Sequence, residues 1–309
     1  HGMKKKGDTA WQMIVLGLLA AAMVVSLMIP ESLLTPAGPK RVEISILLRP
    51  GDSAVWATAR QGMEQAAEDL GAELRFLTLE AEEGADQVEL LRRQADMGVD
   101  AAVVIPADCA ALEQQLDGWQ ALPVVTLESR VEGARAFVGP SDEELGRLLA
   151  EQAARGCAVS GEVLLWNAFP GCAGPARRLE SAKAALEAAG YAPRVCEKLT
   201  AEQLEQADAV LCFEPVSLEQ AAALAAQCET PPRVYGAGVS STVVAALETG
   251  DIAAVAAWSD YAAGYLAVSQ AVNAARRQPV ESKTLPVTLV QEGETYDQDH
   301  QKLLYPVFP

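Results

Sequence analysis

The sequence predicts an α/β protein of two Rossmann-like, doubly wound parallel-sheet lobes, preceded by one N-terminal transmembrane helix. Two observations carry this prediction. From residue 42 onward, short apolar runs alternate with amphipathic stretches, which is the βαβα order of a parallel sheet with helices on both faces. Before residue 42, a lysine cluster precedes a long apolar run that contains no charged residue.

The apolar run Trp11–Ile29 predicts a membrane helix, because about 20 apolar residues span the hydrocarbon core. Lys4–Lys6 precede it and no lysine follows it closely, which predicts a cytoplasmic N-terminus and an extracellular remainder. We interpret residues 1–10 as a cytoplasmic tail and residues 11–30 as an uncleaved, single-pass anchor in the cell membrane. The proline- and glycine-containing residues 31–41 are the expected linker.

Two other interpretations of the apolar run remain open. A cleaved signal peptide needs small residues after the apolar core, whereas Ala20–Ala22 lie in its middle. A buried soluble helix would leave the flanking charges unexplained. A lipoprotein signal is excluded because the first cysteine of the chain is Cys109.

The first series of elements extends from residue 42 to residue 154. Helix ends are indicated by glycines such as Gly71 and Gly98, which suit the left-handed conformation after a helix. The expected strands are Val42–Leu48, Glu73–Leu79, Ala101–Ile105, Val124–Leu127 and Ala136–Val138. The expected helices are Ala54–Leu70, Asp86–Met97, Cys109–Trp119 and Asp142–Ala154.

A second series follows with the same alternation. The expected strands are Glu162–Trp166, Arg194–Glu197, Ala209–Phe213, Val234–Tyr235, Ala253–Ala257 and Leu285–Val290. The expected helices are Pro175–Ala189, a segment ending at Cys228, Ser241–Glu248 and Tyr261–Arg277. The two series exceed one doubly wound sheet and suit two lobes of about 100–150 residues each.

Composition excludes several function classes. The net charge of −18 disfavours nucleic acid as a partner. The histidines are His1 and His300 alone, and no CxxC pair occurs, so neither a metal site nor a cofactor is expected. Enzyme motifs such as GxSxG and GK[ST] are missing from the sequence. We expect the six cysteines to be buried free thiols, with disulfides as the alternative.

Candidate ligand-binding residues lie where predicted strands end, because ligands of open parallel sheets bind beyond the carboxyl ends of the strands. Carboxylate and guanidinium groups there can each give two hydrogen bonds to sugar hydroxyls, and tryptophans can stack on a sugar ring. The candidates are Arg49, Ser53, Trp56, Asp108, Glu128, Arg130, Asn167, Glu214, Trp258 and Asp260.

Several candidates also have a purely structural interpretation. Trp56 and Trp258 are equally compatible with core packing. Glu128 is close enough in sequence to pair with Arg130 alone. Asp108, and likewise Asp52, has the position of a helix N-cap.

The segment from Val42 to Val290 resembles the type I periplasmic binding proteins for ribose, galactose and related sugars, whose fold also forms the effector-binding core of lactose-repressor-like regulators. Five motifs carry the resemblance, in the order that the family has them. They are WATARQGMEQAAEDLG (Trp56–Gly71), VDAAVVIPAD (Val99–Asp108), LPVVTLESRV (Leu122–Val131), FVGPSDEELGRLLAE (Phe137–Glu151) and GYLAVSQAVNAA (Gly264–Ala275).

The resemblance implies a three-strand hinge between two lobes that close on a ligand. It implies an N-terminal lobe of residues 42–140 and 258–281, and a C-terminal lobe of residues 141–257 and 282–309. By position, Trp56 is the aromatic wall, Glu128 a sugar-binding acid, and Arg178 an arginine of the second lobe that contacts sugar hydroxyls. Gly238 replaces a ligand-binding acid and Trp258 a glutamine, so we expect a flatter or less hydroxylated ligand than a simple hexose.

The expected function is capture of a small polar ligand, a sugar or sugar derivative, for an ABC-type importer with its permease. The alternative is a membrane-tethered sensory binding protein that signals to a histidine kinase. An enzyme is the third class, and the missing motifs and histidines argue against it.

Overall fold

The computed structural model describes residues 11, 15–16, 41–49, 56–78 and 84–305. The chain divides into two compact units, His1–Arg41 and Val42–Pro309. In the first unit, Trp11, Val15 and Leu16 are helical and exposed. The rest of the anchor predicted over residues 11–30 lies outside the described residues. Among the residues that are described, no helix combines the length and the apolar character needed to cross a membrane.

The first sheet of the second unit has six parallel strands in the order β11-β5-β4-β3-β1-β2. The strands are β1 (Val42–Leu48), β2 (Ala72–Thr78), β3 (Ala101–Val104), β4 (Val124–Leu127), β5 (Ala136–Pro140) and β11 (Lys283–Leu285).

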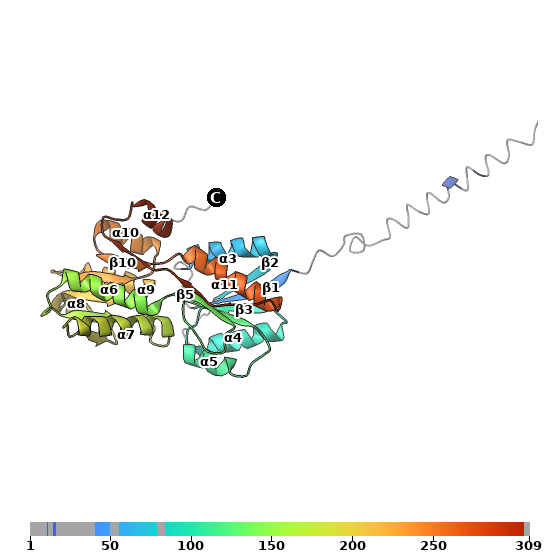
Figure 1. The fold of residues 1–309 in the computed structure, drawn as a ribbon, viewed down its shortest axis with the longest axis horizontal. Helices are drawn as coiled ribbons and strands as arrows, with labels where there is room; N and C mark the ends of the chain where they lie inside the picture. Colours follow the sequence, from blue (N-terminus) through green and yellow to red (C-terminus); the bar gives the residue numbers. More distant parts are fainter. Residues whose placement is uncertain (1–10, 12–14, 17–40, 50–55, 79–83, 306–309) are drawn as a thin grey trace, which may run out of the picture. The chain divides into compact units, whose positions relative to one another are not determined.

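Helices cover both faces of this sheet (Figure 1). The helices are α3 (Ala57–Leu70), α4 (Gly84–Asp96), α5 (Cys109–Leu116) and α11 (Asp260–Ala275). Alternation along β1 separates the faces, because successive strand side chains point to opposite sides. Ile44 and Ile46 share a core with α3 and α11, whereas Leu47 packs in another cluster with residues of α4 and α5.

The second sheet has the order β12-β10-β9-β8-β6-β7, and β12 is antiparallel to β10. The strands are β6 (Val163–Trp166), β7 (Arg194–Cys196), β8 (Ala209–Cys212), β9 (Arg233–Ala237), β10 (Ala254–Ala257) and β12 (Thr288–Gln291). The helices of this half are α6 (Asp142–Gly156), α7 (Ala173–Ala188), α8 (Ala201–Gln206), α9 (Pro215–Ala225), α10 (Ser241–Thr249) and α12 (Gln298–Leu304).

The two sheets repeat one topology. Taken in chain order, the first five strands of each lobe lie in the spatial order 2-1-3-4-5. The strand order reverses between β1 and β3 in the first lobe and between β6 and β8 in the second. Ligands of open α/β sheets bind at such reversals, beyond the carboxyl ends of the strands. This α/β, two-lobed architecture with largely parallel sheets is the fold class that the sequence predicts.

The chain passes between the lobes three times, from β5 to α6, from β10 to α11 and from β11 to β12. The strand expected over Leu285–Val290 corresponds mainly to β12, and only its first residue, Leu285, belongs to β11, which pairs with β5 in the first sheet. The expected assignment of every residue from 282 onward to the second lobe is therefore wrong at β11. Pro286 separates the two strands, because proline has no backbone N–H for a ladder bond.

Local signals set most helix ends. Gly71 is a left-handed C-cap with a φ of 65°, which confirms the helix end predicted there, and Gly250 caps α10 in the same way with a φ of 82°. Two short helices, α8 and α12, were not expected from the sequence. Thr200 and Gln203 form a capping box at the start of α8, a signal that the sequence does contain.

Candidate functional site

A buried ion-pair cluster joins the two lobes at the carboxyl ends of their strands. Arg49 follows β1, Glu128 follows β4, and Arg178 lies on α7 of the second lobe. Arg49 Nη1 lies 2.9 Å from Glu128 Oε2, and Arg178 Nη1 lies 3.5 Å from Glu128 Oε1. The three side chains are at most 2% exposed. Glu128 therefore bridges one guanidinium group from each lobe.

Arg178 has further partners in its own lobe. Its Nε donates to Asp142 Oδ1 at 2.8 Å, and its Nη1 donates to the carbonyl oxygen of Phe213 at 2.9 Å. Its guanidinium carbon lies 5.2 Å from the ring centre of Trp258. Arg178 Nη2 is buried and has no hydrogen-bond partner among the described residues. One nitrogen of the guanidinium group, Nη2, is thus left to donate to another group.

Arg49 faces the loop that follows β6. Its guanidinium carbon lies 4.9 Å from the ring centre of Phe169, and its Nη1 donates to Cys172 Sγ at 3.3 Å. Asn167 Oδ1 accepts from the backbone N–H of Phe169 at 2.9 Å and so shapes the turn that presents the ring. The side chain of Asn167 therefore stabilises the backbone of its own loop.

The backbone at Glu128 is left-handed, with a φ of 70°. This region is costly for a residue other than glycine, and such strain is typically found at functional sites. The next residue, Ser129, accepts from the N–H of Gly174 at 3.0 Å across the lobe interface. A Cβ at Gly174 would lie 2.9 Å from both Glu128 O and Ser129 Oγ, so glycine permits this close approach. The N-terminus of α7 therefore rests directly on the loop after β4.

Trp258 and Asp260 lie beside this cluster, and Trp56 lies in the apolar core. Trp56 and Trp258 are 5% and 4% exposed and belong to the same continuous apolar core. Trp56 Nε1 is buried without a hydrogen-bond partner in the described part of the chain. Asp260 is half-buried; burial, together with the charge of Glu128, raises its pKa to about 7.

Two acidic candidates are helix caps. Glu214 Oε1 accepts from Ser217 N at 2.6 Å and Oε2 from Val216 N at 2.7 Å, at the start of α9. Burial raises the pKa of Glu214, although its hydrogen bonds to Ser217 act in the opposite direction and lower it. Asp108 Oδ1 accepts from Ala111 N at 3.0 Å at the start of α5, so the structural interpretation of Asp108 holds.

The structure brings Arg49, Glu128, Arg178 and Trp258 together and places Asp260 next to them. Arg130 lies elsewhere: it is exposed, 4.7 Å from the ring centre of Phe137. The suggestion that Glu128 pairs with Arg130 alone is wrong, because Glu128 pairs with Arg49 and Arg178. Because the backbone at Glu128 is left-handed, the side chains of Glu128 and Arg130 point in different directions. Ser53 and Asp52 lie outside the described residues.

Sequence reasoning missed Asp142, Phe169 and Cys172. Asp142 is 9% exposed and, although burial raises its pKa, it pairs with Arg178. It lies in the FVGPSDEELG motif, at the first crossover between lobes, where the sequence pattern indicates only the start of a helix. Phe169 and Cys172 lie in a predicted loop, and nothing in the sequence indicates which side of it faces Arg49.

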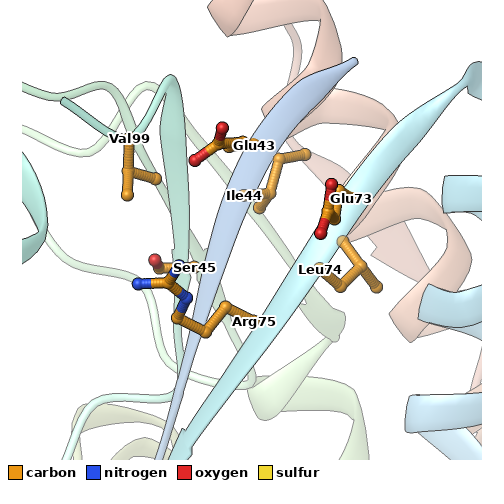
Figure 2. A pocket seen from close by; sticks show the side chains of 7 residues that line it. All are labelled: Glu43, Ile44, Ser45, Glu73, Leu74, Arg75 and Val99. Atoms are coloured by element: carbon orange, nitrogen blue, oxygen red, sulfur yellow. The ribbon is translucent and has the colours of Figure 1, made fainter. Parts of the chain in front are cut away.

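A separate, open hollow lies at the other end of the first sheet. Figure 2 shows its lining, with Glu43 and Ser45 from β1, Glu73 and Arg75 from β2, and Val99. These positions are at the amino ends of the strands, away from Arg49, so the hollow is not part of the cluster. No group of three or more metal-ligating side chains occurs within the described ranges.

Comparison with known proteins gives a family and a set of similar folds. The family model described as "periplasmic binding protein domain" matches residues 44–279. GanP, a glucose-galactose binding protein from Geobacillus stearothermophilus, is 17% identical with a TM-score of 0.73, covering 84% of this chain and 100% of its own. A solute binding protein of an ABC transporter from Agrobacterium vitis, solved with D-fucose, is 17% identical with a TM-score of 0.77 and 85% and 100% coverage.

The structure of a XylFII–LytSN complex is also similar, at 15% identity, a TM-score of 0.70, and coverage of 83% of this chain and 100% of that one. At these identities the likeness to solved structures concerns the fold. A search of curated protein sequences found no match.

Proposed function

We propose that this chain, which belongs to the periplasmic binding protein domain family, is a solute-binding protein that holds a sugar or sugar derivative between its two lobes. One observation carries the proposal. The charged cluster of Arg49, Glu128 and Arg178 joins the carboxyl ends of both sheets and leaves Arg178 Nη2 buried without a described partner. A buried donor of this kind is costly unless another group accepts from it.

A sugar fits the chemistry of the cluster. Hydroxyl groups both donate and accept, so they can bond to Glu128 and Arg178 at once. Trp56 and Trp258 offer apolar faces for ring C–H groups. Similar folds have been solved with D-fucose, D-arabinose and myo-inositol, which supports the class without naming the ligand of this chain.

The surroundings of Gly238 support a ligand with fewer hydroxyl contacts than a simple hexose. Gly238 has a φ of 85°, and a Cβ there would lie 2.5 Å from Pro215 Cγ and 3.5 Å from Trp258 Cη2. The space and the backbone conformation thus disfavour any larger side chain, including an acid. The ligand then has one directional partner fewer on this side and faces the ring of Trp258 instead.

Membrane attachment is part of the proposal. Residues 11–30 would anchor the chain with residues 1–10 in the cytoplasm and the binding unit outside. Protease added to whole cells should then cleave the chain from Lys40 onward and spare Lys4–Lys6. Release of a soluble form that begins near residue 30 would replace the anchor with a cleaved signal peptide.

We propose that the chain delivers its bound ligand to an ABC permease and catalyses no reaction. A sensory role is the second candidate, because the XylFII–LytSN complex shows that a protein of this fold can be solved bound to another protein. For this chain the sensory partner would be a histidine kinase. Adjacent permease and ATPase genes favour the importer, whereas adjacent kinase and response-regulator genes favour the sensor.

A thermal-shift screen tests the ligand class directly. The full chain in detergent is heated with a panel of pentoses, hexoses, deoxysugars and inositols, since ligand binding raises stability by RT ln(1 + [L]/Kd). We expect at least one member to raise the Tm, and calorimetry then gives its affinity. If no sugar raises the Tm while ligands from another class do, the sugar assignment is wrong.

A further inference from the structure

Cys109 and Cys172 meet across the lobe interface. Cys109 opens α5 in the first lobe, and Cys172 precedes α7 in the second. The N–H of Cys109 donates to the carbonyl oxygen of Gly171 at 2.9 Å, and the N–H of Ala173 donates to Cys109 Sγ at 3.2 Å. Cys109 therefore contacts the residue on each side of Cys172.

The thiol of Cys172 points back toward the segment that leads into Cys109. Its Sγ lies 3.2 Å from the carbonyl oxygen of Pro106 and 3.5 Å from that of Ala107. Arg49 Nη1 donates to the same sulfur at 3.3 Å. Each cysteine thus lies against the backbone beside the other. A disulfide in general needs two cysteines whose Cα atoms are roughly 4.4–6.8 Å apart.

The remaining cysteines lack such a neighbour in the contacts of the described chain. Cys157 Sγ contacts the carbonyl of Asp208, Cys196 Sγ that of Arg194, and Cys228 Sγ those of Ala201 and Leu224, all within the second lobe. Cys212 is fully buried in β8. A bond between Cys109 and Cys172 is the one that would tie the two lobes together.

We propose that Cys109 and Cys172 form a reversible disulfide that holds the lobes closed. The proposal goes beyond ligand binding and does not depend on which ligand is bound. The oxidant is a small-molecule or protein disulfide. The thiolate of one cysteine attacks it and releases one thiol, and the second cysteine thiolate then displaces the other thiol. Two protein thiols are oxidised, one external disulfide is reduced, and the two protons that the protein thiols lose are taken up by the two leaving thiolates, which become thiols.

Closure controls access to this pair. Cys109 and Cys172 are 8% and 0% exposed, so an external disulfide reaches them only when the lobes separate. Burial also raises the pKa of both thiols, that of Cys172 to about 12, which keeps them unreactive in the closed arrangement. The first exchange then occurs in an open state, and closure supplies the second thiol.

Oxidation of the full chain tests the pair. The chain is purified reduced in detergent and incubated with oxidised glutathione, and free thiols are counted. We expect a loss of two thiols per chain, from six to four, and their recovery with dithiothreitol. Combined digestion with trypsin and Glu-C separates Cys157 from Cys172 and should give a linked pair of peptides, residues 94–113 and 163–177, by mass spectrometry.

Matched variants identify the bond. Cys109→Ser and Cys172→Ser should each abolish the linked peptide pair, whereas Cys228→Ser should keep it. The wild-type peptide analysis stands by itself if either serine variant folds poorly. Wild-type chain that keeps six free thiols, forms only glutathione adducts, or links a different pair of cysteines would overturn the proposal.

Discussion

At the scale of single residues, the cluster shows why sequence reasoning finds some site residues and misses others. Glu128, Arg178 and Trp258 follow predicted strands or match family motifs, so their positions could be expected. Their partners could not, because the left-handed backbone at Glu128 decides that its carboxylate meets Arg49 and Arg178. The same turn leaves Arg130, the next charged residue, exposed. A single φ angle is a tertiary outcome that strand and helix patterns do not contain.

Arg178→Ala should weaken both folding and binding. The change leaves the buried carboxylates of Glu128 and Asp142 without this partner, which typically costs about 3–5 kcal/mol of unfolding free energy. For a ligand that bonds to the arginine we expect roughly 30-fold or weaker binding. Arg177, its exposed neighbour, is the control, and Arg177→Ala should change stability by about 0.5 kcal/mol or less. Urea unfolding and calorimetry measure both; equal effects of the two substitutions would show that the site lies elsewhere.

Asp260 should make stability depend on pH between about 4 and 7. Burial, followed by the charge of Glu128, raises its folded pKa from 3.8 to about 7. The folded state therefore binds the proton more tightly than the unfolded chain, so stability falls as pH rises through this window, by up to about 1.4 kcal/mol per pH unit. Asp260→Asn mimics the protonated form and should flatten this slope. Urea unfolding at pH 5, 6, 7 and 8 checks it, and parallel curves for the two proteins would contradict the assignment.

At the scale of elements, most helices and strands follow directly from apolar periodicity and glycine caps. The contacts between elements follow less directly. Helix α11 lies along α3, although about 190 residues separate them in the chain. Two glycines permit this approach: a Cβ at Gly62 would overlap the carbonyl oxygen of Tyr261, and one at Gly264 would overlap that of Ala59. Glycine inside a helix is unfavourable, so the sequence alone gives no reason for Gly62 and Gly264. The close packing of α3 against α11 explains both.

Gly264→Ala should therefore destabilise the first lobe. Alanine favours an isolated helix by about 1 kcal/mol over glycine, but here its methyl group must push α11 away from α3. Overpacking typically costs about 1–3 kcal/mol, so we expect a net loss of unfolding free energy. Ser269→Ala, half-buried on the same helix, is the control and should have little effect. Chemical denaturation distinguishes them; a more stable Gly264→Ala protein would show that the two helices can separate at no cost.

At the scale of the whole Val42–Pro309 unit, the sequence predicts two lobes because two series of βαβα elements are too many for one sheet. Family resemblance adds the crossovers, which periodicity alone does not contain. Neither source predicts that the lobes touch through the N-terminus of α7, where Gly174 rests on Ser129. That contact joins the same two segments, helix α7 and the loop after β4, as the Glu128–Arg178 ion pair. Closure of the lobes and assembly of the cluster are therefore one event.

Gly174→Val should hold the lobes apart. Its Cβ would lie 2.9 Å from Glu128 O and Ser129 Oγ and 3.3 Å from Arg178 Nη2, and the two added methyl groups need still more room. The two closest contacts, to Glu128 and Ser129, lie between the lobes, so opening at the three crossovers relieves them without unfolding. We expect a larger radius of gyration for residues 42–309 in small-angle X-ray scattering, a nearly unchanged far-UV circular dichroism spectrum, and loss of ligand affinity. Gly171→Ala is the matched control, because the nearest neighbour of a Cβ there is Ala107 O at 3.4 Å, and it should scatter like the wild type. An unchanged radius of gyration in Gly174→Val would mean that α7 can shift within its own lobe, and that closure does not depend on this contact.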